Sequence, residues 1–461
     1  MYKKLILGSP GTGKTTRLLS ILQDKLLTVQ PERIAFFSFT KKAVSEAIER
    51  AESKFSLDRK RFKYFKTLHS LAFTATNQNT NNVINYHHLK RLEKITGFKL
   101  SFGKIAEEEI VEKGDKFIFA ENHARYTKVD LKQVWSEHLP DIDWSEFKWF
   151  VDVYNKYKQE NNVIDFTDML QAFMNTDIDL PLEIAFIDEA QDLNPLEWDI
   201  VNKAISNCKE VYIAGDDDQA IYEWSGADVN HFLTMPITEK EVLPVTYRLP
   251  APIYDFANTL VKRISHRYEK EWKPLDRDGQ VIFHNELSHI DFEGQWLILV
   301  RNNYQIRTIQ DKLRERGIYY ATKYGSSIDA QHLKLIQAYI SKQKGTATSA
   351  ETDLIYSVFK TSKQWYEALI QISLPDREYY RSLLRNGIKF SEAPTIMINT
   401  IHGSKGGEAD NVLLLTDISQ KVYDHMQKNE NTEHRVFYVG CTRARHNLHI
   451  LIPQTTLFYQ M

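Results

Sequence analysis

One acidic segment contains an unusual set of residue types for chemistry. GDDDQAIYEWSGAD at 215–228 places three aspartates, Gln219, Tyr222 and Trp224 directly after the apolar run VYIA. An apolar run that ends at a turn glycine is typical of a short buried strand. Acid, amide and two large aromatic side chains at a strand end indicate the edge of an active site. Taken alone, the segment is equally consistent with an acidic surface loop that carries two peripheral aromatics.

The first residues of the chain predict a nucleotide-binding pocket. An apolar run at 4–7 leads into GSPGTGKT at 8–15, which fits the phosphate-loop pattern GxxxxGK(S/T), and helical character follows. Glycines let backbone N–H groups converge on phosphate oxygens, and the helix amino terminus adds its positive dipole. We expect Lys14 to reach the β- and γ-phosphates of ATP and Thr15 to ligate Mg²⁺. The expected loop consists of Gly8, Ser9, Pro10, Gly11, Thr12, Gly13, Lys14, Thr15 and Thr16.

A pair of adjacent carboxylates follows a second apolar run. Asp188 and Glu189 come directly after EIAFI at 183–187. We expect Asp188 to complete the coordination of Mg²⁺ and Glu189 to polarise the water that attacks the γ-phosphate. An acidic turn after a strand is the alternative, and it is weakened by the phosphate loop upstream and by GDDDQ downstream.

Composition narrows the class of protein. The chain has 461 residues and a formal net charge of -2, so bulk charge argues neither for nor against nucleic acid. Locally, residues 41–66 hold nine lysines and arginines against four acidic residues. Cys208 and Cys441 lack CxxC spacing, which excludes a zinc ribbon, an iron–sulfur cluster and a disulfide framework. No stretch resembles a membrane span or a signal peptide, so we expect a cytoplasmic protein without membrane contact.

Strand-like apolar runs alternate with polar or helical segments, as in parallel α/β sheets. They fall into two groups, within 5–214 and within 281–415, which predicts two α/β domains with a ligand cleft between them. The segment at 76–158 is mostly helical in pattern. The later runs lie at 295–300, 395–398 and 411–415.

Three later segments add polar and cationic side chains. PVTYR at 244–248 places Tyr247 beside Arg248, a glycine-rich turn at 399–408 carries His, Lys and Glu, and RVFYVGCTRAR at 435–445 carries three arginines. Arginine suits a γ-phosphate because its planar fork donates two charge-assisted hydrogen bonds and stays protonated. Each segment alone could be an ordinary surface loop.

Together these segments resemble the UvrD/Rep/PcrA-type branch of superfamily 1 DNA helicases over nearly the whole chain. The resemblance implies an α/β fold with two RecA-like P-loop NTPase motor domains built on parallel sheets, at 1–75 with 159–235 and at 236–328 with 393–461. It also implies a helical insertion at 76–158 and a reduced insertion at 329–392. The matching segments are the phosphate loop, FSFTKKAVSEAIER, KTLHSLAF, VIDFTDML, DEAQD, GDDDQAIYEWSGAD, VTYRLP, LVRNNYQIR, NTIHGSKGGEAD and RVFYVGCTRAR.

The resemblance further implies roles for single residues. Gln219 would sense the γ-phosphate, Tyr247 would stack on adenine, and Glu408 would contact the ribose. Arg248 and Arg443 would bind the γ-phosphate across the cleft, completing the catalytic set with Lys14, Asp188 and Glu189. Aromatic stacking binds bases of any sequence, as a motor requires. The residues that would line the single-strand path are Phe39, Thr40, Lys42, Thr67, His69, Tyr222, Trp224, Arg301, Asn303 and His402.

The function that the resemblance implies is an ATP- and Mg²⁺-dependent helicase and translocase. It would bind single-stranded DNA and junctions of single- and double-stranded DNA, move 3′ to 5′, and act as a monomer in the cytoplasm of a bacterial cell or a phage-infected host. The alternatives are a DNA-dependent ATPase that strips proteins or remodels recombination intermediates, and a nucleotide-gated DNA-binding adaptor.

Three features depart from the family pattern. No adenine-reading glutamine segment precedes the phosphate loop, so we expect GTP to support turnover nearly as well as ATP. Ser225 stands where the family has an arginine. The insertion at 329–392 is small, and we expect it to be unable to act as an independent gate.

Overall fold

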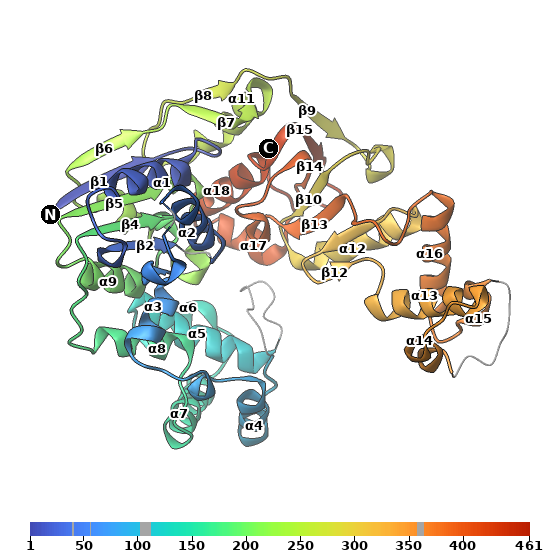
Figure 1. The fold of residues 1–461 in the computed structure, drawn as a ribbon, viewed down its shortest axis with the longest axis horizontal. Coiled ribbons are helices and arrows are strands. Elements are labelled where there is room, and N and C mark those ends of the chain that lie inside the picture. Colours follow the sequence, from blue (N-terminus) through green and yellow to red (C-terminus); the bar gives the residue numbers. More distant parts are fainter. Residues whose placement is uncertain (39–40, 56, 102–111, 357–363) are drawn as a thin grey trace. The chain divides into compact units, whose positions relative to one another are not determined.

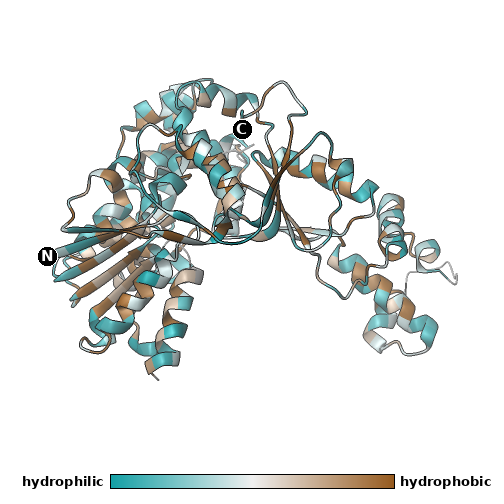
Figure 2. Cartoon of the chain, turned by 90° about the horizontal axis from the view of Figure 1, so that it is seen from above, coloured by the Kyte–Doolittle hydropathy of each residue, from teal (hydrophilic) through white to brown (hydrophobic). Residues whose placement is uncertain are grey.

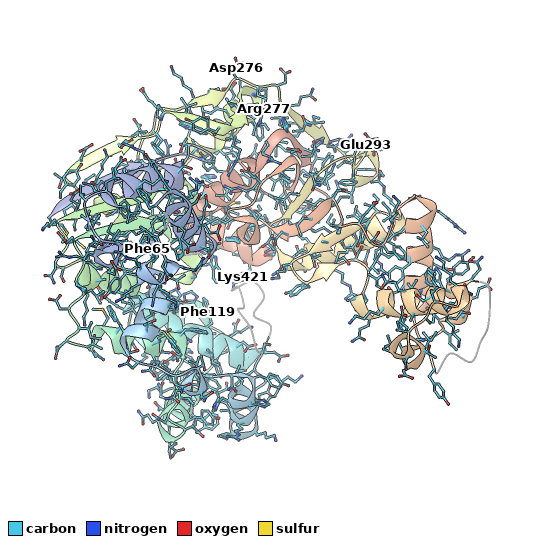
Figure 3. The ribbon with its side chains drawn as sticks, viewed as in Figure 1. Phe65, Phe119, Asp276, Arg277, Glu293 and Lys421 are labelled. Carbon is cyan, nitrogen blue, oxygen red and sulfur yellow. The ribbon has the colours of Figure 1, made fainter. Side chains whose placement is uncertain are left out.

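The computed structural model describes residues 1–38, 41–55, 57–101, 112–356 and 364–461, and these form two compact units. Unit 1 contains Met1–Leu249, Leu260–Asp276 and Glu430–Tyr438, and the remaining segments form unit 2. Asp276 and Arg277, labelled in Figure 3, mark one of the places where the chain passes from unit 1 to unit 2.

A six-stranded sheet forms the core of unit 1, with neighbours paired in parallel in the order β3-β2-β4-β5-β1-β6 (Figure 1). Leu7 lies opposite Gly215 and Ser38 lies opposite Asp188, so the carboxyl ends of these strands meet at one edge. The strands are β1 (Tyr2–Leu7), β2 (Ile34–Ser38), β3 (Tyr64–Lys66), β4 (Ile184–Asp188), β5 (Glu210–Gly215) and β6 (Glu239–Val242).

Helices cover both faces of this sheet, because its strands are apolar on both sides. Leu5 and Leu7 belong to one buried cluster and Ile6 to another, as expected for side chains that alternate along a strand. The first cluster includes residues of α3 (Leu68–Ala75), α8 (Phe166–Met174), α9 (Pro195–Ala204) and α10 (Val229–Thr234). The second includes residues of α1 (Lys14–Lys25) and α2 (Lys41–Phe55). In Figure 2 the strands are coloured mostly as hydrophobic.

Four helices between β3 and β4 have an apolar core of their own, rich in aromatic rings. They are α4 (Tyr86–Thr96), α5 (Lys113–Thr127), α6 (Leu131–His138) and α7 (Trp144–Glu160). A buried ionic network ties α5 and α7 to the start of α8: Arg125 and Lys158 both contact Asp165, at 2.5 and 2.7 Å. Burial alone would raise the pKa of Asp165, but the two cations lower it to about 2.

Unit 2 is built on a seven-stranded sheet in the order β12-β11-β13-β10-β14-β15-β9, parallel except for the β11–β12 pair. Its helices include α12 (Asn303–Glu315) and α17 (Gln420–Met426). The strands are β9 (Gln280–His284), β10 (Trp296–Val300), β11 (Tyr320–Thr322), β12 (Gly325–Ser326), β13 (Ile396–Thr400), β14 (Ala409–Leu415) and β15 (Ala444–Leu451).

The helices between β12 and β13 share the core of this sheet. Buried residues of α13 (Ala330–Lys344), α15 (Trp365–Ala368) and α16 (Leu374–Arg385) belong to the same apolar cluster as Ile298 and Ile398 of the strands. A short helix, α14 (Ser349–Leu354), lies between α13 and α15 in sequence.

Two helices are divided between the units: α11 (Ala251–Val261) and α18 (Glu430–Cys441). Residues 236–249 are predicted from the sequence to belong to the second motor domain, whereas the structure groups them with unit 1 because β6 pairs with β1. The boundaries of the two insertions stay predictions. Within the described ranges, every helix is too short or too polar to cross a bilayer.

Candidate nucleotide-binding site

The phosphate loop connects β1 to α1 at the carboxyl edge of the unit 1 sheet. Gly11 and Gly13 have φ of 73° and 84°, a left-handed conformation that side chains with a Cβ rarely adopt. Gly11 also has no room for a side chain, because a Cβ there would lie 2.4 Å from the Cβ of Arg248. Inside the loop, the Lys14 ammonium donates to the Gly8 carbonyl at 2.8 Å.

Strand β4 delivers the carboxylate pair to the same edge. The Thr15 hydroxyl donates to Asp188 at 2.8 Å, which joins the expected Mg²⁺ ligands. Burial raises the pKa of Asp188 to about 7, and the neighbouring Glu189 carboxylate adds to the rise. Glu189 itself has a φ of 54°, a costly conformation for a residue other than glycine.

The donor set fits a magnesium nucleotide. A threonine hydroxyl and a carboxylate are hard oxygen ligands of the kind that Mg²⁺ takes together with substrate phosphates. Ser9 is buried in the same loop, and its hydroxyl is a hydrogen-bond donor that suits a phosphate oxygen. The helix that begins at Lys14 adds a positive dipole at the loop.

One glutamine that sequence reasoning overlooked joins the carboxylate pair to the acidic turn after β5. The Gln191 amide donates to Glu189 at 2.6 Å, and its carbonyl oxygen accepts from the backbone N–H of Asp216 at 3.0 Å. Asp216 in turn accepts from the Gln219 amide at 2.6 Å. The expected catalytic base and the expected γ-phosphate sensor are therefore linked through two side chains. The DEAQD motif contains Gln191, so the motif could have pointed to it.

Strand β7 (Val245–Pro250), which pairs with β8 (Lys273–Leu275), lies against the phosphate loop. The Thr246 hydroxyl donates to the Pro10 carbonyl at 2.7 Å, and the backbone N–H of Tyr247 donates to Gly11 at 2.8 Å. The Tyr247 ring is 72% exposed and would be 3.8 Å from a Cβ on Gly13. An exposed ring beside the loop suits stacking on a base. Thr246, a buried anchor of this arrangement, lies in the VTYRLP segment, but its residue type alone does not predict the contact with Pro10.

One of the two aromatic residues after β5, Trp224, contacts helix α5. Trp224 stacks on Phe119 of α5 at 6.4 Å and contacts Tyr222 edge to face at the same distance (Phe119 is labelled in Figure 3). Thr67 caps α3 by accepting from the backbone N–H of Ser70. His69 contacts the Phe166 ring, which is 61% exposed. The contacts of Phe119 and Phe166 were not foreseen, because each helix contains other aromatic residues and the sequence does not single out these two.

Five predicted site residues belong to unit 2, and their relation to the phosphate loop stays a prediction. Arg301 and Asn303 follow β10, and His402 follows its neighbour β13. Arg443 is buried and donates to the Val439 carbonyl at 3.0 Å, whereas Glu408 is exposed, 3.7 Å from Arg445.

Three predicted site residues cannot be placed in the same way. Phe39 and Thr40 are not among the described residues, and neither is the side chain of Lys42. Near the phosphate loop, the Arg17 guanidinium pairs with Glu241 at 2.9 Å.

A phosphate loop between a parallel strand and a helix defines unit 1 as a P-loop nucleotide-binding domain. The family model of the UvrD/REP helicase N-terminal domain matches residues 2–238. The family model of the UvrD-like helicase C-terminal domain matches residues 334–455. The chain therefore belongs to the UvrD/Rep family, which confirms the resemblance. The family match and the two parallel sheets confirm the predicted fold of two RecA-like P-loop NTPase domains.

Individual relatives are distant. YjcD of Bacillus subtilis (strain 168) is 25% identical over 404 residues, covering 77% of this chain and 52% of its own length. ATP-dependent DNA helicase Rep of Buchnera aphidicola subsp. Baizongia pistaciae is 24% identical over 68% of this chain and 52% of its own length. ATP-dependent DNA helicase PcrA of Leuconostoc citreum is 25% identical over 73% of this chain and 50% of its own length. The chain thus matches about half the length of these curated relatives.

Among solved structures, the helicase nonstructural protein 10 of an arterivirus, in complex with DNA, aligns with 98% of this chain and 62% of its own. The sequence identity is 11% and the TM-score is 0.38. The fold assignment rests on the family match and the sheets.

Proposed function

We propose that the chain is the motor of an ATP-dependent DNA helicase that translocates 3′ to 5′ on single-stranded DNA. The observation that carries the proposal is the continuous chain of contacts at one sheet edge of unit 1. It runs from Thr15 and Asp188 through Glu189 and Gln191 to Asp216 and Gln219. The proposed metal ligands, base and phosphate sensor are thereby joined by hydrogen bonds.

Each residue has a defined part in phosphoryl transfer to water. Lys14 and the loop N–H groups bind the phosphates of ATP, and Thr15 and Asp188 hold Mg²⁺. Glu189 orients the attacking water, and Gln191 keeps that carboxylate in place by donating to it at 2.6 Å. Gln219 responds to the γ-phosphate. Arg248 and Arg443 stabilise the charge of the transition state.

A short segment couples this chemistry to DNA. Gln219 precedes Tyr222 and Trp224 within the same turn after β5, so a shift of the amide displaces the two rings on which bases stack. Trp224 also rests on Phe119, which carries the displacement to helix α5 of the insertion. Bases then pass from ring to ring as ATP is bound and hydrolysed.

The polarity, the preference for junctions and the sufficiency of a monomer rest on the family resemblance. Among the described residues, the buried side chains of α13, α15 and α16 belong to the same apolar cluster as the unit 2 sheet, which supports a monomer without an independently folded gate.

The decisive experiment is unwinding of tailed duplexes with 3′ or 5′ overhangs, in DNA and in RNA, alongside ATP turnover with and without single-stranded DNA. We expect DNA-stimulated turnover and unwinding of the 3′-tailed DNA duplex, and neither activity with Lys14→Ala. Stimulated turnover without unwinding of either duplex would identify a translocase that strips proteins. Nucleotide binding without turnover would identify an adaptor.

A further inference from the structure

A buried ionic cluster lies under the acidic turn after β5. The Lys270 side chain is fully buried, and its ammonium lies 2.8, 2.5 and 2.8 Å from Asp216, Asp217 and Asp218. Arg267 adds a bidentate pair to Asp218, with both N–O distances at 2.7 Å. Three consecutive aspartates thus pair with two cations, and both cations come from the segment Leu260–Asp276.

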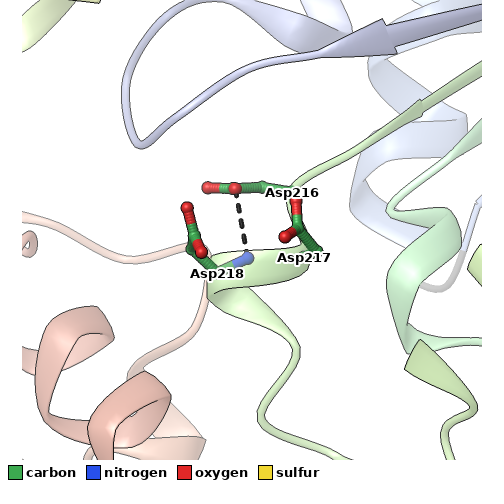
Figure 4. A group of neighbouring side chains, drawn as sticks. All are labelled: Asp216, Asp217 and Asp218. Carbon is green, nitrogen blue, oxygen red and sulfur yellow. Dashed lines mark hydrogen bonds between the residues drawn. The ribbon is translucent and has the colours of Figure 1, made fainter. Parts of the chain in front are cut away.

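The aspartates converge closely enough for a metal site, with ligand oxygens within 4.8 Å of one another (Figure 4). The Lys270 ammonium already contacts all three carboxylates, and a divalent ion among them would lie next to this cation. The turn is therefore organised by a lysine, and the magnesium ligands are those of the phosphate loop and β4.

Both segments that hold the turn continue into unit 2 along the chain. Lys270 and Arg267 lie in Leu260–Asp276, and this segment also donates the Tyr268 N–H to Asp217 at 2.8 Å. Arg435, in Glu430–Tyr438, donates to the Asp217 carbonyl at 3.0 Å and to the His266 carbonyl at 2.8 Å. The acidic turn is therefore the point in unit 1 on which these two connecting segments are fixed.

Asp216 links this cluster to the phosphate sensor. One carboxylate oxygen contacts Lys270 at 2.8 Å, and the other accepts from the Gln219 amide at 2.6 Å. We propose that Lys270 and Arg267 are positioning residues that orient Gln219 through the acidic turn. The inference rests on the proposed function, because Gln219 needs a γ-phosphate to sense. A displacement of the Leu260–Asp276 segment would be passed to Gln219 through two polar contacts, from Lys270 to Asp216 and from Asp216 to Gln219.

The test measures two properties of purified full-length variants. The first is the kcat and KM of ATP turnover with single-stranded DNA. The second is the ratio of the Kd values for fluorescent mant-ADP and mant-AMPPNP, which reports γ-phosphate sensing without hydrolysis. Arg267→Lys keeps the charge and removes the bidentate fork, and Gln219→Met removes the sensor. The double variant shows whether the two residues act through one another.

Arg267→Lys is expected to lower kcat by about 10- to 100-fold, the cost of a small misplacement, while KM changes little. Its preference for mant-AMPPNP over mant-ADP should fall toward that of Gln219→Met. In the Gln219→Met background the further loss should vanish. Losses that multiply in the double variant would overturn the proposal.

Lys158→Met is the matched control for Lys270→Met. Lys158 is also a buried lysine of unit 1, 2.7 and 2.8 Å from the carboxylates of Asp165 and Asp168. Both variants should melt at lower temperature, but only Lys270→Met should change kcat and the nucleotide preference. If Lys158→Met changes kcat and the preference for mant-AMPPNP over mant-ADP as much as Lys270→Met does, Lys270 only stabilises the fold. If Lys270→Met does not fold, Arg267→Lys decides.

The wild-type protein separates failure of this inference from failure of the proposed function. A wild type without DNA-stimulated turnover would contradict the function. The ratio of mant-ADP to mant-AMPPNP affinities would still show whether Arg267 and Gln219 act together.

Discussion

Unit 1 and unit 2 are built on the same kind of parallel sheet but differ in the residues at the carboxyl ends of their strands. In unit 1, β1 and β4 lead into a glycine-rich loop and a carboxylate pair, which suit a phosphate and a magnesium ion. In unit 2, β10 and β13 lead into Arg301, Asn303 and His402 instead. The sheet fixes where the loops lie, and the loop residues decide the chemistry.

The two units also bury their ionisable groups differently. Unit 1 places charges of opposite sign in contact, as in the clusters around Lys270 and Asp165. Unit 2 instead pairs a buried histidine, His449, with the half-buried His284, and their ring nitrogens lie 2.8 Å apart. Buried charges must be paired, whereas an imidazole can be buried in its neutral form. The two units should therefore respond differently to charge removal and to acid.

The largest expected effect is that of removing Arg443, the unit 2 arginine to which the proposed function gives a role in hydrolysis. Arg443→Met should lower kcat by about 10³-fold or more, the usual value of an arginine that stabilises the transferring phosphoryl group. Nucleotide affinity should change much less, because unit 1 holds the phosphates. Single-turnover ATP hydrolysis and mant-AMPPNP titration measure the two quantities.

Arg445→Met is the control, since Arg445 is partly exposed and pairs with Asp410 at 3.0 Å. A similar loss of kcat in both variants would contradict the role of Arg443.

Removal of the expected base in unit 1 should have the next largest effect. Glu189→Gln should lower ATP turnover by about 10²- to 10⁴-fold, the range for general base catalysis. The variant should still bind ATP, because Glu189 orients water, whereas Lys14→Ala should lose binding as well. Turnover by Glu189→Gln at the wild-type rate would show that another group is the base.

Loss of one stacking ring should have a smaller effect. Trp224→Ala should weaken single-stranded DNA binding by about 1–3 kcal/mol, the value of one base–aromatic stack. Fluorescence anisotropy with a labelled oligonucleotide measures it. Trp149→Ala is the comparison, because that ring is 47% exposed on α7 and contacts the Phe98 ring. Equal DNA affinity in both variants would assign Trp224 to packing against Phe119 alone.

The smallest effect concerns stability in mild acid. Burial lowers the pKa of His449 to about 4, and the neighbouring His284 contributes. The unfolded chain gains a proton as the pH falls through about 6.5, whereas the folded protein resists protonation down to about 4. The contribution of neutral His449 to the stability of the folded protein is therefore complete above pH 6.5, and it is lost progressively as the pH falls from 6.5 to 4.

Melting temperatures between pH 7 and 5 test this sign. The melting temperature of the wild type should fall more steeply with acid than that of His449→Gln, which lacks the titrating ring. Parallel curves for the two proteins would show that His449 does not contribute. The Asp165 network of unit 1 should not weaken in this range, since its carboxyl stays ionised down to a pKa of about 2.

The sequence by itself determined the phosphate loop, the carboxylate pair after β4 and the class of fold. These features are local: GSPGTGKT and DEAQD each carry their chemistry within a few consecutive residues, and the alternation of strands and helices is periodic along the chain. Physical constraints on such segments act between near neighbours, so the pattern of residue types is sufficient to predict them.

Only the tertiary structure decided which distant residues complete the site. Lys270 stands in HRYEKEWK, a charged run that indicates a solvated segment. The structure instead buries it against Asp216, Asp217 and Asp218, which belong to a distant part of the sequence. Thr246 contacts Pro10, although the two residues are 236 positions apart. Such contacts depend on the order of strands in the sheet and on the path of the chain between the units. Neither is encoded in the periodicity of any one segment, because burial of a charge is favourable only where the partners from other segments meet it.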